Sequence, residues 1–217
     1  MRSSNKRCSV DIDIQRVLSQ NITLVYDALD LQTIDSSKLK GLIDAKAMVM
    51  DTPEMIVAVY PPHPIIIQIG DRRTRITLQR QSEDIGAVPL WEIAIKCHQL
   101  VPRSQLVAYG FNYDVGVVVA DGNAQAITMD LFVSNRQMIE NVLEGHLVSF
   151  VPRLKFRRGE TFYDLILEPL DEQRIKAHLN AHFQDNTLPP QDQLEASFRQ
   201  EFGYLVLMLP RLFEGSN

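Results

Sequence analysis

The stretch that decides the fold is Met55–Gln81, MIVAVYPPHPIIIQIGDRRTRITLQRQ. Its runs Met55–Tyr60 and Pro64–Ile69 are rich in Ile and Val, which favour strands. The prolines between the runs lack an N–H for a sheet hydrogen bond, so they mark an edge, a bulge or a connection. Gly70-Asp71 permits a turn, and Arg75–Gln81 then alternates apolar and polar side chains. We expect three antiparallel strands, the second covered on both faces and the third with one wet face.

The segments around this stretch complete a first α+β unit. Asn21–Leu31 alternates like a strand, and Lys38–Ala45 has apolar residues at helical spacing after a capping Asp-Ser-Ser sequence. Leu90–Val101 has the periodicity of an amphipathic helix, and Gln105–Val119 reads as a long strand. The order is the β-α-β-β-α-β order of a ferredoxin-like unit.

Turn residues at 120–123 suggest a boundary, after which a second α+β unit follows. Its expected elements are a helix at Asn135–Gly145, a hairpin of Leu147–Phe156 and Thr161–Leu167, and the longest helix at Gln191–Phe213. Arg174–Phe183 alternates and favours a strand, although its composition also fits a helix.

The predicted fold class is therefore α+β, with antiparallel sheet and helices packed on one face. The predicted layout is a flexible or poorly defined amino terminus (1–20), a first unit (21–119) and a second unit (120–217). The two units could also fuse into one domain.

Composition sets bounds on the class of protein. The chain has 217 residues with a hydrophobic fraction of 45% and a net charge of -5, so no global basic field points to nucleic acid or to an anionic membrane. No apolar run has the length of a membrane span, and the amino terminus lacks the apolar region of a secretory signal. The two cysteines make no disulfide framework. These features favour a cytoplasmic protein that is not associated with a membrane.

No sequence motif for catalysis, cofactor binding or metal binding is recognisable. His178 and His182 are four residues apart, but on a strand they lie too far apart to share one ion. Cys97 falls on the apolar side of its helix, where a thiol behaves as a small buried hydrophobe. We therefore expect no catalytic residues, no metal and no cofactor, and a function in binding.

Two surfaces are predicted for binding. The leading hypothesis is a non-catalytic interaction or assembly module that binds a protein partner, or a second copy of itself, through sheet edges and an apolar stripe on the last helix. The stripe comprises Tyr204, Leu205, Leu209 and Phe213. The alternative is nucleic-acid or phosphate binding by two basic hairpins, which carry Arg72, Arg73, Arg75, Arg153, Lys155, Arg157 and Arg158. A second alternative is an enzyme or small-ligand binder whose pocket is not visible in the sequence.

Overall fold

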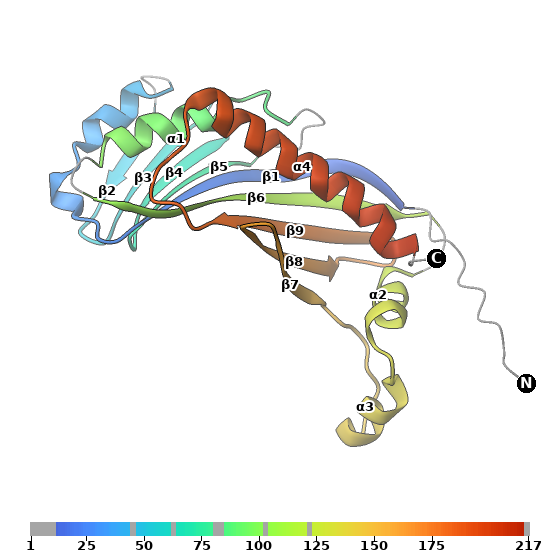
Figure 1. Cartoon of the computed structure of the whole chain (residues 1–217). Coiled ribbons are helices and arrows are strands. Elements are labelled where there is room, and N and C mark those ends of the chain that lie inside the picture. The colour runs from blue at the N-terminus through green and yellow to red at the C-terminus, as the bar shows by residue number, and fades with distance from the viewer. Residues whose placement is uncertain are drawn as a thin grey trace, which may run out of the picture.

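A computed structural model describes residues 12–43, 47–61, 64–79, 85–101, 104–120 and 123–214, with the backbone alone for 12–16 and 214. The chain forms one large antiparallel sheet with helices (Figure 1). Cys8, His63, Arg80 and residues 121–122 of the predicted boundary lie outside the described residues. Across the described chain, no helix combines the length and the apolar composition needed to cross a membrane.

The sheet has nine strands in the order β2-β3-β4-β5-β1-β6-β9-β8-β7. Every neighbouring pair is antiparallel. The strands are β1 (Ile12–Tyr26), β2 (Met48–Asp51), β3 (Met55–Tyr60), β4 (Ile65–Gly70), β5 (Arg73–Leu78), β6 (Leu106–Val119), β7 (Arg153–Arg158), β8 (Thr161–Pro169) and β9 (Arg174–Phe183).

The Met55–Gln81 stretch forms β3, β4 and β5, as predicted. In β4, Ile65, Ile67 and Ile69 are fully buried, but Ile66 and Gln68 on the other face are only half-buried. The expectation that this strand is covered on both faces is therefore wrong. The strand is rich in apolar residues because three Ile lie on its buried face and Ile66 lies on the other face.

The amino-terminal part and the first helix differ from the prediction. β1 already begins at Ile12 and pairs with β5 and β6, so residues 12–20 belong to the sheet rather than to a flexible terminus. In the described part of 38–45, the predicted helix is replaced by the end of a 3₁₀ helix, η2 (Ser36–Gly41), and another 3₁₀ helix, η1 (Leu31–Thr33), precedes it. The Asp30 and Asp35 side chains each cap one of these turns by accepting from a backbone N–H. The ferredoxin-like order is not confirmed, because β2 to β5 form a consecutive meander.

The sheet continues across the predicted boundary between the units. β6 from the first unit pairs with β9 from the second, from Tyr109 opposite Phe183 to Val118 opposite Arg174. This pairing also shows that residues 174–183 form a strand, as preferred from their alternation.

Of the α-helices in the described residues, α1 (Leu90–Gln99) and α4 (Gln191–Glu214) cover one face of the sheet (Figure 1). α2 (Ala124–Phe132) and α3 (Arg136–Leu143) lie beyond the β8 side of the sheet. α2 was not expected from the sequence, although the Asn123 side chain caps it by accepting from two backbone N–H groups. Pro210 does not end α4, which continues to Glu214.

The core fills the space between the sheet and helices α1 and α4. Phe198 of α4 is fully buried and its ring lies 5.3 Å from that of Phe111 and 5.1 Å from that of Tyr113. Trp91 of α1 packs 6.0 Å from the same ring. The sheet face opposite α1 and α4, called here the open face, carries the half-buried side chains of each strand.

Candidate functional site

The apolar stripe predicted to bind a partner lies in the core. Leu205 and Leu209 are fully buried and Phe213 is 2% exposed, because α4 lays this stripe on the sheet. Tyr204 is half-buried, with its ring under the Arg158 guanidinium at 4.4 Å. The stripe therefore stabilises the fold, which corrects the expectation that it is available to a partner.

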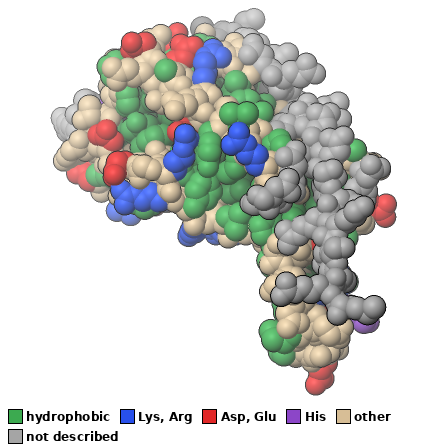
Figure 2. Space-filling view, turned by 45° about the vertical axis from the view of Figure 1, so that its right-hand side comes forward, with side chains coloured by type: hydrophobic (Ala, Val, Ile, Leu, Met, Phe, Trp, Pro, Cys, Tyr) green, Lys and Arg blue, Asp and Glu red, His purple; other side chains and the backbone are tan. Residues whose placement is uncertain are grey.

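Exposed apolar side chains gather in two other places: the outer strand β2, with Met48 and Met50, and α3 with the segment after it, called here the α3 arm (residues 133–152). The arm projects away from the sheet, and Figure 2 shows hydrophobic side chains on this projecting part. α3 has no buried residue, and Met138, Val142 and Leu143 are 55%, 77% and 61% exposed. Val148 and Val151 are also exposed.

The arm is braced by its own polar contacts. The Asn135 side chain caps α3 by accepting from the backbone N–H of Met138. Glu140 accepts from the Leu147 N–H and from Arg136 Nε, both at 2.9 Å, while Arg136 also donates to the Leu147 carbonyl. The Leu147 N–H and then Arg136 hold the pKa of Glu140 below its usual range. These bonds fix the returning chain against α3 and leave the apolar side chains facing outward.

The open face carries a polar ladder, formed by one side chain from each of four neighbouring strands. Asn180 donates to Asn112 (2.6 Å), Asn112 to Asn21 (2.8 Å) and Asn21 to Thr77 (2.8 Å). In the next row, Ser19 and His178 both bond to Asp114, at 2.6 and 2.7 Å. Burial raises the pKa of Asp114, but the bonds to His178 and Ser19, together with the Coulombic effects of His178 and Lys176, leave it below its usual range. The centre of the open face is thus polar, ordered and only partly exposed.

The predicted basic residues divide between the faces. Register places Arg73 and Arg75 of β5 and Arg153, Lys155 and Arg157 of β7 on the open face. Five strand spacings, about 24 Å, separate β5 from β7, so the two hairpins form separate groups.

The other two basic residues lie elsewhere. Arg72 sits in the β4–β5 turn with a positive φ, and Arg158 turns to the α4 side, over Tyr204.

Basic side chains outnumber carboxylates on the open face of the described strands. The carboxylates each have a cationic or histidine neighbour: Asp164 accepts from Arg153 at 2.9 and 3.1 Å, and Glu168 lies 3.6 Å from Lys176. The Arg153 hydrogen bonds hold the pKa of Asp164 below its usual range. The basic residues of this face are Arg73, Arg75, Arg153, Lys155, Arg157, Arg174 and Lys176, against Asp114, Asp164 and Glu168.

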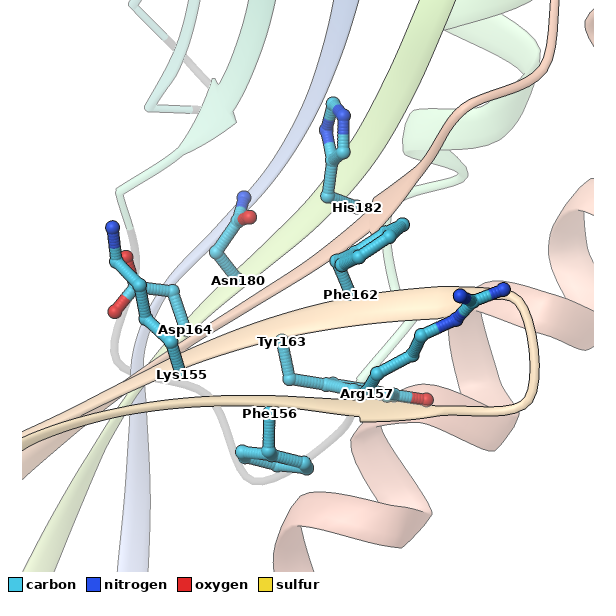
Figure 3. Close-up of a pocket in the computed structure, with 8 residues that line it drawn as sticks. All are labelled: Lys155, Phe156, Arg157, Phe162, Tyr163, Asp164, Asn180 and His182. Atoms are coloured by element: carbon cyan, nitrogen blue, oxygen red, sulfur yellow. The ribbon is translucent and has the colours of Figure 1, made fainter.

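A hollow of about 460 Å³ lies over β7, β8 and β9. Lys155, Arg157, Phe162, Asp164, Asn180 and His182 line it from the open face, while Phe156 and Tyr163 point to the other side of the sheet (Figure 3). The Phe162 ring is 38% exposed and lies 5.1 Å from the Arg157 guanidinium. Partial burial lowers the pKa of His182, which favours its neutral form.

The remaining polar candidates give no reactive site. The Cys97 thiol is fully buried, and burial raises its pKa to about 12, so it is not a nucleophile near neutral pH. Among the described residues, no group of three or more His, Cys, Asp or Glu side chains could hold a metal ion.

Comparisons with known proteins give no family. No protein-family model and no curated protein sequence matches the chain. A similar solved structure is "Methanococcus jannaschii TBP", with a TM-score of 0.31 and 10% identity over 89% of this chain and 97% of that one. A likeness this distant carries no argument about the chain, so its function is argued from its own surfaces.

Proposed function

We propose that this chain is a non-catalytic interaction module that docks the α3 arm into an apolar groove of a different protein. The observation that carries the proposal is that α3 is amphipathic and has no buried residue. A helix of eight residues is marginal in water, and its stability ordinarily comes from packing of its apolar face. An apolar face that its own chain does not cover is typical of a docking element.

The energetics favour a groove over a helix-to-helix contact between two copies. Met138, Val142 and Leu143 are 55%, 77% and 61% exposed, so completing their burial would contribute about 3 to 6 kcal/mol. Association alone costs roughly 4 to 15 kcal/mol. Two arms packed side by side would bury each face only in part, which leaves little surplus over the cost of association. A groove that also buries Val148 and Val151 would add apolar area to the interface and so increase the free energy gained on binding.

The chemistry of the arm sets further limits on the partner. The groove must be lined by apolar side chains, and its rim must tolerate the exposed Glu144 at the end of α3. We place this interaction in the cytoplasm, because two cysteines make no disulfide framework of the kind that secreted domains carry.

Photo-crosslinking tests the proposal directly. A benzophenone amino acid at Val142 should capture a partner protein in the cells from which the gene comes, whereas the same group at Leu207 should not. Leu207 is a matched control, because it is 62% exposed but lies on α4. With the captured partner purified, Leu143→Ser should weaken binding in calorimetry by about tenfold or more, and Leu207→Ser should leave it unchanged.

Three results would overturn the proposal. Equal crosslinking from both positions would show that the arm is not special. Wild-type affinity of Leu143→Ser would show that the apolar face is not buried in the complex. Crosslinks to a second copy of this chain would replace the different partner with self-association.

A further inference from the structure

A second surface, the hollow over β7, β8 and β9, brings together three kinds of polar or aromatic group. It has cations at its edge, an exposed aromatic ring at its centre, and amide and imidazole groups at its back. From this combination we propose that the hollow binds single-stranded nucleic acid, with a base stacked at Phe162 and the adjoining phosphates held by Lys155 and Arg157. This inference is independent of the α3 arm.

The stacking platform comes from Phe162 and Arg157 together. Phe162 stands on the open face opposite His182 in the register, and its ring is 38% exposed where the sheet alternation usually places a polar side chain. The Arg157 guanidinium lies over the ring, 5.1 Å from its centroid, so a base would either stack on the guanidinium plane or displace it from the ring toward the adjoining phosphates. Unpaired bases stack on aromatic rings and on guanidinium planes alike.

The phosphate contacts come from alternate residues of the edge strand. Lys155 and Arg157 project from the same face of β7, about 7 Å apart along the strand. Arg157 is bonded to Glu160, but the Glu160 side chain is 94% exposed and such surface pairs contribute little. A phosphate can therefore replace Glu160 at low cost.

The back of the hollow offers hydrogen bonds to a base edge. Asn180 donates Nδ2–H to Asn112, and no described donor reaches its carbonyl oxygen, which is left to accept from a base. His182, neutral near pH 7, can both donate and accept. Asp164 does not repel the phosphates strongly, because two bonds from Arg153 neutralise it.

The open face also gives a path for a longer strand. From the hollow, the polar ladder leads across β9, β6 and β1 to Arg75 on β5, four strand spacings or about 19 Å from β8. Arg75 and Arg73 are exposed on that strand. An oligonucleotide that spans this path should bind more tightly than one that fills the hollow alone.

A peptide strand added to the β7 edge is disfavoured by the same residues. Four basic side chains occupy the six positions of β7, and a charged edge of this kind prevents pairing with another strand. Nucleic acid is the ligand that turns these charges into favourable contacts.

Fluorescence anisotropy with a labelled poly-pyrimidine oligonucleotide of about ten nucleotides tests the inference. Binding should weaken steeply between about 50 and about 200 mM salt. Phe162→Ala should weaken binding about tenfold, and Lys155→Ala and Arg157→Ala should also reduce the dependence on salt. Arg75→Ala should weaken the long probe but not one of about four nucleotides.

The controls lie away from the open face. Lys96→Ala removes an exposed cation from α1, and Leu207→Ala removes an exposed apolar side chain from α4, so neither should change the affinity. Wild-type protein that shows no binding at about 50 mM salt overturns the inference, as does Phe162→Ala with wild-type affinity. Equal affinity for inorganic polyphosphate would also overturn it, since polyphosphate has no base to stack.

Discussion

Replacing Leu209 with Ala should destabilise the fold strongly, because the structure buries this residue fully between α4 and the sheet. Buried Leu→Ala substitutions cost about 2 to 5 kcal/mol through lost burial and a residual cavity. The same substitution at Leu143 should change the free energy of unfolding by less than about 0.5 kcal/mol, since this side chain is 61% exposed. The contrast separates a stripe that stabilises the fold from one that is available to a partner.

Trp91 gives a direct assay, because it is the single tryptophan of the chain and packs against Phe198 of α4. Urea unfolding followed by Trp91 fluorescence should show the Leu209→Ala midpoint lower by about 1 M, for a slope of about 3 kcal/mol per M. The Leu143→Ala midpoint should coincide with that of the wild type. A Leu209→Ala midpoint equal to wild type would refute the docking of α4 on the sheet. A large loss for Leu143→Ala would refute the exposure of α3.

Two further substitutions test the packing of charge and backbone. Burial raises the pKa of Glu201, whose carboxylate accepts from the Tyr163 hydroxyl at 2.8 Å, so the folded chain binds this proton more tightly than the unfolded chain does. The contribution of Glu201 to stability should therefore fall as pH rises above about 4.5. The urea midpoint of the wild type should accordingly fall relative to that of Glu201→Gln between pH 4 and 8, and parallel curves for the two proteins would contradict this. At Gly70 an added Cβ would lie 2.8 Å from the Glu54 carbonyl oxygen, so Gly70→Ala should lower the free energy of unfolding by about 1 to 3 kcal/mol. Gly41 is the control: no atom lies within 4 Å of an added Cβ there, so Gly41→Ala should leave the urea midpoint nearly unchanged.

Alternation of apolar side chains predicted most of the sheet from the sequence. β5 and β9 were recognisable from alternation, β3 and β4 from their Ile and Val content, and β6 as one long strand. The order of the strands was not predictable in the same way. That order depends on β1, whose fifteen residues pair with β5 on one side and β6 on the other, far apart in the sequence.

The two apolar helix faces show why the site was harder to predict than the fold. α3 and α4 both have apolar residues at helical spacing, and periodicity does not say what covers them. α4 has 24 residues and lies along the sheet, whereas α3 has eight and stands off it. From the sequence, the docking role is therefore predicted for the longer stripe, and the segment Asn135–Gly145 is predicted only to be a helix.

The net charge of -5 did not indicate the basic surface, because it gives no information about which face each charge lies on. Net charge averages over all faces, but strand alternation sorts side chains onto one face or the other. In this chain the basic residues of β5, β7 and β9 fall on the open face, while the carboxylates of the same face are bonded to Arg153, Lys176, Ser19 or His178. On the open face, an anionic ligand over the hollow would therefore meet more basic side chains than carboxylates. Because the α3 arm lies on a separate projection, a protein in its groove and a nucleic acid on the open face would make contacts with different residues.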